Sequence, residues 1–222
     1  MGLRWGRASA LPPGFRPAWC GMRRFPVHRT INLMRTYQRR LLHWDEVGKR
    51  VFVTFRLHGS LPANRIFPPE RMTAGEVFVA MDRILDRAEN GPRYLERPAI
   101  ADMVAGSILD GDQVFRRYEL HAFVVMPKHV HMLVTSLVRL ADWTRSLKGF
   151  TGHEASRLPG LSGTPFGQDE SYDRLVRNDG ECSRIKRYIE WNPVKAGLCD
   201  FPAAFFWSSG TPGGSPAAGR KP

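Results

Sequence analysis

Two histidines, His129 and His131, stand one residue apart in the stretch VVMPKHVHMLV. The β-branched and apolar residues around them favour a strand. Side chains two apart along a strand point to the same face, so both imidazoles would face one way while Val130 turns to the opposite layer. Two imidazoles on one face can bind a single metal ion. Because an isolated HxH is not specific, a half-buried or solvent-facing pair without chemistry is the alternative interpretation.

A second pair of chemically capable residues lies near the C-terminus, in CSRIKRYIEWN. There Tyr188 and Asn192 are neighbours at i and i+4. At about 100° per residue they fall on the stripe expected to pack on the sheet, which consists of Cys182, Ile185, Tyr188, Ile189 and Asn192. The structural alternative is a tyrosine hydrogen-bonded at a layer edge and an asparagine that closes the helix before Pro193. If this helix covers the histidine strand, two imidazoles and an amide oxygen form a mixed ligand set suited to Mg²⁺ or Mn²⁺ acting on a phosphate.

Hydrophobic periodicity predicts the elements that must position these residues. A strand is expected from Arg50, a helix over 73–90 with Thr73 as N-cap and Glu76 completing a capping box, and a final helix that ends at Pro193. The other expected elements are an antiparallel hairpin of strands 118–126 and 129–136, a helix over 139–158 and an extended piece or hairpin over 166–176. This order predicts an α+β, ferredoxin-like fold, with helices packed on an antiparallel sheet.

The bulk composition narrows the function classes. The chain has 222 residues with 42% hydrophobic content, enough for an ordinary core, and a formal net charge of +12. Such an excess of positive charge favours a polyanionic partner, with nucleic acid ahead of membrane or acidic protein. Three cysteines without close spacing argue against a disulfide framework or a cysteine-rich zinc site. Because no apolar run approaches the roughly 18 residues of a membrane helix, we expect a soluble cytoplasmic protein.

The two ends of the chain differ in composition from its middle. Residues 1–40 are rich in Arg, Pro and Gly and predict a basic, disordered arm, unless they derive from an upstream start codon and have no function. Residues 210–222, with the sequence GTPGGSPAAGRKP, predict a disordered tail. The expected folded domain is therefore 41–209.

Five segments carry a resemblance to a known family: VVMPKHVHMLV, LKGFTGHEASRL, FGQDESYDRLVRN, RYIEWNPVKAGL and WSS. In their order and rough spacing, from about Arg40 to Ser209, they resemble the REP-associated tyrosine transposases of bacteria, which are single-tyrosine HUH transposases. The resemblance implies the HUH transposase fold for 41–209. It also implies that His129 and His131 are metal ligands, that Tyr188 is the nucleophile and that Asn192 completes the metal site.

The resemblance further implies a metal-dependent nicking and joining activity on single-stranded or hairpin DNA formed by repetitive palindromic elements. The tyrosine hydroxyl attacks a phosphodiester and leaves a 5′-phosphotyrosine and a free 3′-OH, whose re-attack rejoins a strand without ATP. Mg²⁺ or Mn²⁺ is the implied cofactor, the protein would work at the bacterial nucleoid, and relatives are monomers or homodimers. Two alternatives stay open: an inactive or domesticated hairpin-DNA binder, and an RNA-binding ferredoxin-like protein.

Further residues are candidates for nucleophile or DNA contacts. Tyr172 in ESYDRLV is the rival nucleophile, although only Tyr188 has a polar partner one turn away before a helix stop. Gly167 and Trp191 depart from the family pattern, and Trp143, Trp191 and Trp207 can stack bases or pack in the core. The basic residues expected to contact phosphates are Lys128, Arg145, Lys148, Arg174, Arg177, Arg184, Lys186, Arg187 and Lys195.

Overall fold

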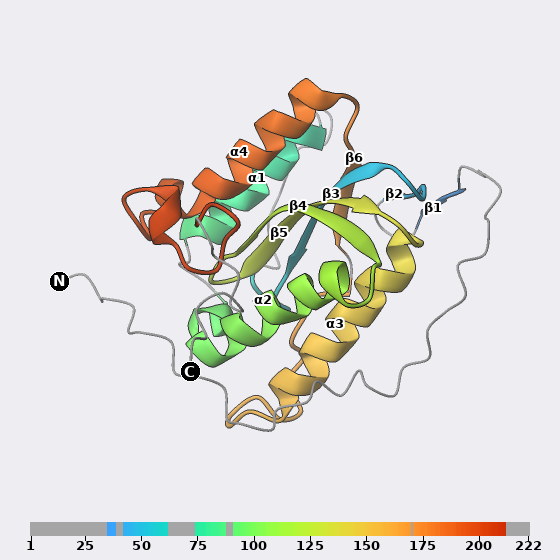
Figure 1. Cartoon of the computed structure of the whole chain (residues 1–222). Helices are drawn as coiled ribbons and strands as arrows, with labels where there is room; N and C mark the ends of the chain where they lie inside the picture. The colour runs from blue at the N-terminus through green and yellow to red at the C-terminus, as the bar shows by residue number, and fades with distance from the viewer. Residues whose placement is uncertain (1–34, 39–41, 62–73, 88–90, 170, 212–222) are drawn as a thin grey trace.

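The computed structural model describes residues 35–38, 42–61, 74–87, 91–169 and 171–211 (Figure 1). The expected N-cap Thr73, most of the expected N-terminal arm and nearly all of the expected tail lie outside these residues. One part of the expected arm does not: Arg35–Gln38 forms strand β1, which pairs with β2 (Leu42–Asp45) in a separate two-stranded antiparallel sheet.

The main sheet has four antiparallel strands in the spatial order β4-β5-β3-β6. The strands are β3 (Arg50–Arg56), β4 (Tyr118–Val125), β5 (His129–Ser136) and β6 (Tyr172–Leu175). The expected hairpin is confirmed, because β4 pairs with β5. If only the four strands of this sheet are numbered along the chain, their spatial order is 2-3-1-4, which is the order of the ferredoxin-like fold. The α+β prediction is therefore confirmed.

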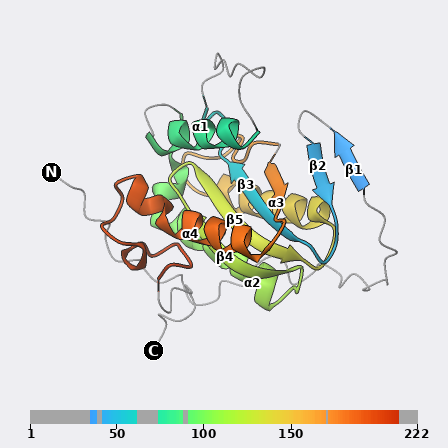
Figure 2. The ribbon, with the colours of Figure 1, turned by 90° about the horizontal axis from the view of Figure 1, so that it is seen from above.

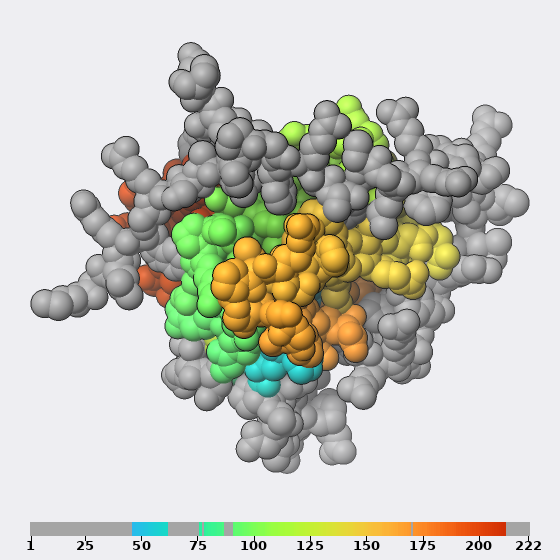
Figure 3. All heavy atoms as spheres, turned by 90° about the horizontal axis from the view of Figure 1, so that it is seen from below, coloured from blue at the N-terminus to red at the C-terminus, as the bar shows by residue number. Residues whose placement is uncertain are grey.

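Four α-helices cover the two faces of this sheet: α1 (Ala74–Arg87), α2 (Pro98–Gln113), α3 (Leu140–Ser156) and α4 (Asp179–Lys195). Figure 2 shows α1 and α4 on one face, with β3 and β5 visible between them. The other face is covered by α2 and α3, which are seen from below in Figure 3. Short 3₁₀ turns lie at Tyr94–Glu96 and Pro202–Ala204.

Among the four α-helices, α2 is the one that sequence patterns did not predict. Its segment PAIADMVAGSILDGDQ carries buried residues on more than one side, among them Ile100, Val104, Ala105 and Ile108, which blurs the amphipathic period. Because α2 packs beside α3, it takes the place of the crossover helix that the expected pattern gave to 73–90. Helix α1 is thereby placed on the opposite face, next to the histidine strand.

The sheet is buried on both faces. The alternation in β3 predicts one apolar face, yet Val51 through Phe55 are all buried because helices cover both sides. On β5, Ser136 accepts a hydrogen bond from Trp143 Nε1 of α3 at 3.0 Å, so the even-numbered residues face the α2 and α3 layer. The odd-numbered residues, including both histidines, face α1 and α4.

The sequence predicted that helix α4 ends at Pro193, but the helix continues to Lys195. Proline has a helix-compatible φ and loses only one backbone hydrogen bond in the last turn. The end is set by Gly197, whose φ of +70° allows a Schellman motif. Its hydrogen bonds run from Gly197 N to Val194 O at 3.0 Å and from Leu198 N to Pro193 O at 2.9 Å.

Candidate metal and tyrosine site

The two histidines of β5 converge with a carboxylate from α1. Their Nε2 atoms are 3.0 Å apart. Asp82 Oδ1 lies 3.3 Å from His129 Nε2 and 3.0 Å from His131 Nε2. All three side chains are buried. Two ring nitrogens and one carboxylate oxygen therefore form a compact set of potential metal ligands.

Asp82 is the functional residue that sequence reasoning missed. It belongs to the face of α1 that packs on the sheet, one turn after Phe78 and shortly before Leu85, both of which are buried. A carboxylate inside such an apolar stripe was the available signal, since charged residues are rarely buried without a partner. The partner was not visible, because the histidines are far away in the chain.

The two candidate residues of α4 meet the same carboxylate from the other side. The Tyr188 hydroxyl donates a hydrogen bond to Asp82 Oδ2. Asn192 Nδ2 donates to the same oxygen at 3.1 Å. Asn192 is fully buried, and its Oδ1, the atom that a ligand role requires, makes no hydrogen bond among the described residues. The structure thus brings together all four sequence-predicted site residues, around an aspartate that was not predicted.

The electrostatics of the cluster follow from burial and close charges. Burial raises the pKa of Asp82, but attraction by His131 and His129 outweighs this effect, so the pKa lies well below its usual range. Burial lowers the pKa of His129 to about 3, with repulsion from His131 in the same direction. The pKa of Tyr188 is raised, first by burial and then by the Asp82 charge. Asp82 is therefore a carboxylate and Tyr188 a protonated phenol in the metal-free protein.

A second carboxylate, Asp86, lies one turn further along α1. Its Oδ1 is 3.9 Å from His129 Nε2 and is buried without a hydrogen bond among the described residues. Burial and repulsion from Asp82 raise the pKa of Asp86 to about 8, although Lys195 acts in the opposite direction. A nearby cation would lower this pKa by the same Coulombic effect.

The donor set fits a divalent cation. Ligand bonds of about 2.0–2.2 Å place adjacent ligand atoms about 3 Å apart, which matches the 3.0–3.3 Å separations among the three atoms. Asp82 Oδ1 is buried and has no hydrogen-bond partner among the described residues, which fits an atom that can coordinate a cation. His131 Nδ1 lies 2.8 Å from Thr54 Oγ1, a contact that orients the ring with Nε2 toward the cluster.

The basic residues predicted to contact phosphates are not on one surface. Arg184, Lys186, Arg187 and Lys195 are exposed on α4, and Lys195 Nζ lies 4.6 Å from the centre of the Tyr188 ring. Arg177 is exposed just before α4, and Arg174 lies on β6, at the edge of the main sheet. Arg145 and Lys148 lie on α3, on the opposite face of the sheet, and Lys148 Nζ donates to Asp169 O at 2.6 Å. Lys128 is 1% exposed, so it does not belong to the exposed basic surface, and its phosphate contact stays a prediction.

The aromatic candidates also lie in different environments. Tyr172, the rival nucleophile, stacks against Phe78 with ring centres 4.7 Å apart. Trp143 and Trp207 are buried, which makes them core residues and not stacking platforms, whereas Trp191 is 40% exposed. No described helix is both long and apolar enough to cross a bilayer.

Fold and cluster together define an α+β protein in which a strand-borne histidine pair, a helical aspartate and a helical tyrosine meet in a buried site. The chain matches no protein-family model, and no curated protein matches it. Among solved structures it is similar to a REP-associated tyrosine transposase bound to a REP hairpin. The identity is 18% and the TM-score 0.50, over 79% of this chain and 82% of the other. This likeness confirms, at the level of the fold, the resemblance drawn from the motifs.

Proposed function

We propose that this chain is a metal-dependent transposase that nicks and joins single-stranded DNA at hairpin-forming palindromic sequences, with Tyr188 as the nucleophile. The observation that carries the proposal is that Tyr188, Asn192 and both histidines converge on Asp82. A phenol beside a hard-cation ligand set inside a basic protein is suited to phosphodiester chemistry. The catalytic domain in this proposal is 41–209.

The covalent step forms a bond between the Tyr188 oxygen and the scissile phosphorus and breaks the bond from phosphorus to the 3′ oxygen. The phenolic proton leaves the tyrosine, and a proton is taken up by the departing 3′ oxygen. Asp82 Oδ2 accepts the hydrogen bond from the phenol in the free protein, so it is the first acceptor in line for that proton. The raised pKa of Tyr188 keeps the phenol protonated in the free protein.

A divalent cation, Mg²⁺ or Mn²⁺, would be held by Asp82, His129 and His131, with Asn192 Oδ1 as a further candidate ligand. When bound, it supplies a Lewis acid that polarises the scissile phosphate and orients it. The side chain of Thr54 holds the His131 ring in place for this role. Asn192 also steadies the carboxylate of Asp82 through its amide nitrogen.

The proposed DNA partner agrees with the charge and with the fold neighbour. The formal net charge of +12 and the exposed cations of α4, close to Tyr188, suit a phosphate backbone. The neighbour of the same fold is bound to a REP hairpin, and we extend that substrate class to this chain. A protein with this activity would work at the bacterial nucleoid, as a monomer or a homodimer.

The decisive experiment uses 5′- and 3′-labelled single-stranded oligonucleotides that contain the palindromic repeats flanking its own gene, with and without Mg²⁺ or Mn²⁺. A 5′-phosphotyrosine predicts that the 3′-labelled fragment stays attached to denatured protein while the 5′-labelled fragment is released. Tyr188→Phe should abolish the adduct, and Tyr94→Phe, an aromatic change away from the cluster, should retain it.

Two other outcomes would change the assignment. An adduct that is kept in Tyr188→Phe and lost in Tyr172→Phe would transfer the nucleophile role to Tyr172. Retarded but uncleaved DNA under every metal condition would leave a hairpin-binding protein without catalysis.

A further inference from the structure

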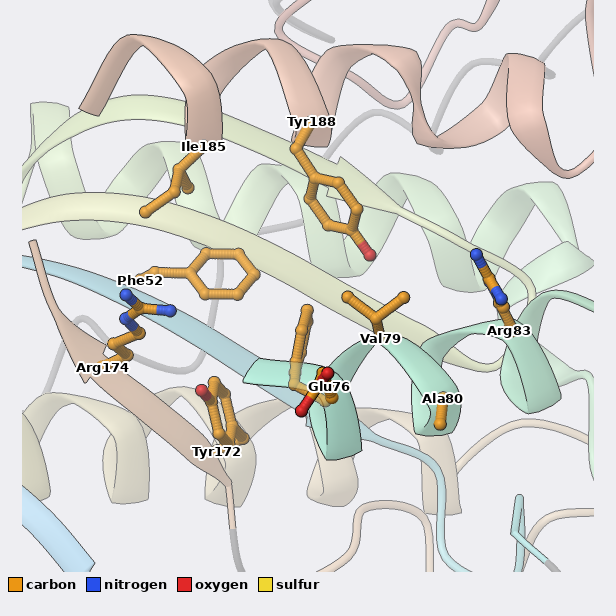
Figure 4. Close-up of a pocket in the computed structure, with 10 residues that line it drawn as sticks. Phe52, Glu76, Val79, Ala80, Arg83, Tyr172, Arg174, Ile185 and Tyr188 are labelled. Atoms are coloured by element: carbon orange, nitrogen blue, oxygen red, sulfur yellow. The ribbon is translucent and has the colours of Figure 1, made fainter. Parts of the chain in front are cut away.

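A cavity opens directly beside the proposed nucleophile. It has a volume of about 640 Å³ and lies between α1, β6 and α4, with Phe52 of β3 beneath it. Figure 4 shows Tyr188 and Ile185 reaching in from α4 and Tyr172 lying across from them on β6. Since Tyr188 lines this cavity and also contacts Asp82, the cavity and the metal and tyrosine site share a wall.

Four of the ten residues that line the cavity are aromatic: Phe52, Phe78, Tyr172 and Tyr188. Phe78 and Tyr172 stack at 4.7 Å between ring centres, and Phe52 packs edge-on against Phe78 at 5.3 Å. Ile185 and Val79 add aliphatic surface. Flat aromatic and apolar surface of this kind stacks nucleobases regardless of sequence, and the volume falls in the range of small-ligand sites, about 300–1,000 Å³.

Two guanidinium groups stand on opposite sides of the cavity. Arg83 of α1 is exposed, and Arg174 of β6 is partly exposed. Figure 4 shows the two side chains at opposite ends of the cavity. Arg174 Nη2 donates to Glu181 Oε1 at 2.6 Å, which fixes its orientation, while a guanidinium retains further donors for a second partner. Arginines in such positions bind phosphate oxygens through paired hydrogen bonds.

We infer that this cavity receives the base of a nucleotide adjoining the scissile phosphate, and that Arg83 and Arg174 hold the phosphates on either side of that nucleotide. The inference rests on the proposed function and deepens it, because it names where the substrate strand is gripped. An apolar metabolite would make no use of Arg83 or of the donors that Arg174 retains beside its bond to Glu181, whereas a nucleotide uses the aromatic walls and both cations together. Tyr172 then acts as a wall of the base site and not as a nucleophile.

The test measures binding, so it does not depend on catalysis. Hairpin oligonucleotides with a randomised single-stranded flank are selected for binding to the full-length Tyr188→Phe protein in EDTA. The tightest binder is then remade with an abasic site at each flank position in turn. One position should weaken binding about 5- to 150-fold, the equivalent of about 1–3 kcal/mol for one stacked base, and it should adjoin the site that wild-type protein cuts.

A pair of tryptophan variants, each made in the Tyr188→Phe background, locates the effect in the protein. Val79→Trp fills the cavity from a position that is 39% exposed, and Val114→Trp places the same residue at a 65% exposed position at the end of α2, in the other layer. The affinity of Val79→Trp for intact DNA should be as low as the affinity of its Tyr188→Phe parent for the abasic DNA. Removal of the base should not lower the affinity of Val79→Trp any further. Val114→Trp should behave like that parent in both measurements.

An abasic scan without a sensitive flank position would overturn the inference, even if an adduct forms at Tyr188. An equal abasic penalty in Val79→Trp and Val114→Trp would overturn it as well. Should Val79→Trp fail to fold by circular dichroism, Arg83→Ala replaces it, with Arg157→Ala on the opposite layer as the charge-matched control. In that comparison only Arg83→Ala should weaken binding. A sensitive flank position in a protein that forms no adduct would retain the binding of a base in this cavity, but it would refute the proposed catalysis and with it the position beside a scissile phosphate.

Discussion

The phenol of Tyr188 donates a hydrogen bond to Oδ2 of Asp82, the residue whose other carboxylate oxygen lies 3.0 Å from His131 Nε2. One carboxylate from α1 therefore joins a side chain of α4 to the histidine strand. Asp82 is buried and Tyr188 is partly buried, so the carboxylate has little access to water as an alternative partner. The proposed nucleophile and the proposed metal ligands are thus coupled electrostatically through Asp82. A change to the ligands should therefore alter the environment of the tyrosine, and the reverse.

Removal of the Asp82 charge should remove metal binding. Asp82→Asn takes away the only anionic member of the His129, His131 and Asp82 cluster. The loss of Mn²⁺ affinity, measured by isothermal titration calorimetry, should exceed the roughly 10- to 100-fold that outer contacts of a metal site contribute. Asp142→Asn, an exposed aspartate on α3, serves as the control and should bind as wild type. Equal affinities in the two variants would show that the cation binds elsewhere.

The contact between Thr54 and His131 should tune that affinity. Thr54→Val keeps the shape of a buried side chain but removes the hydroxyl that lies 2.8 Å from His131 Nδ1. We expect Mn²⁺ binding about 10- to 100-fold weaker, because the ring loses its orienting partner. Thr135→Val is a matched control, since Thr135 Oγ1 lies 2.7 Å from His121 Nε2 on the same sheet but outside the cluster. If both variants lose affinity alike, the contact has no special role.

Asp86 should make the metal-free protein less stable as the pH rises. Its folded-state pKa of about 8 lies above the ordinary value of 3.8, so folding retains a proton that the unfolded chain has released between these limits. The stabilisation is complete below about pH 4 and is lost by about pH 8. Asp86→Asn should therefore raise the free energy of unfolding progressively across this window. Urea titrations in EDTA at several pH values measure it, and a difference that does not vary with pH would contradict the prediction.

Gly111 should resist substitution for steric reasons. A Cβ at this position of α2 would overlap the Tyr118 hydroxyl oxygen, and Tyr118 is itself buried, with its hydroxyl donating a hydrogen bond to Ile108 O at 2.7 Å. Gly111→Ala should destabilise the protein by about 1–3 kcal/mol through overpacking. Gly106→Ala, in the same helix and with open space around it, should instead stabilise by about 0.5–1 kcal/mol. Denaturant midpoints measure both effects: the midpoint should fall for Gly111→Ala and rise for Gly106→Ala.

The sequence by itself determined the local elements and the chemistry they carry. The two-residue period of β5 places His129 and His131 on one face, and the helical period of α4 aligns Tyr188 with Asn192, because both relations lie within one element. The strand order of a ferredoxin-like sheet also followed, since a short hairpin and crossover connections leave few alternatives. These features depend on residues close in the chain.

Only the tertiary structure decided the third ligand and the neighbours of the site. Asp82 carries no motif, and its role depends on which face of the sheet α1 covers. That choice was made by α2, whose buried residues span a wide arc that weakens its helical period and which occupies the place beside α3. Burial then shifts the pKa values of Asp86 and His129, which no spacing can indicate. Long-range packing selects one partner among many residues of equal local pattern, and for that reason the sequence alone leaves it open.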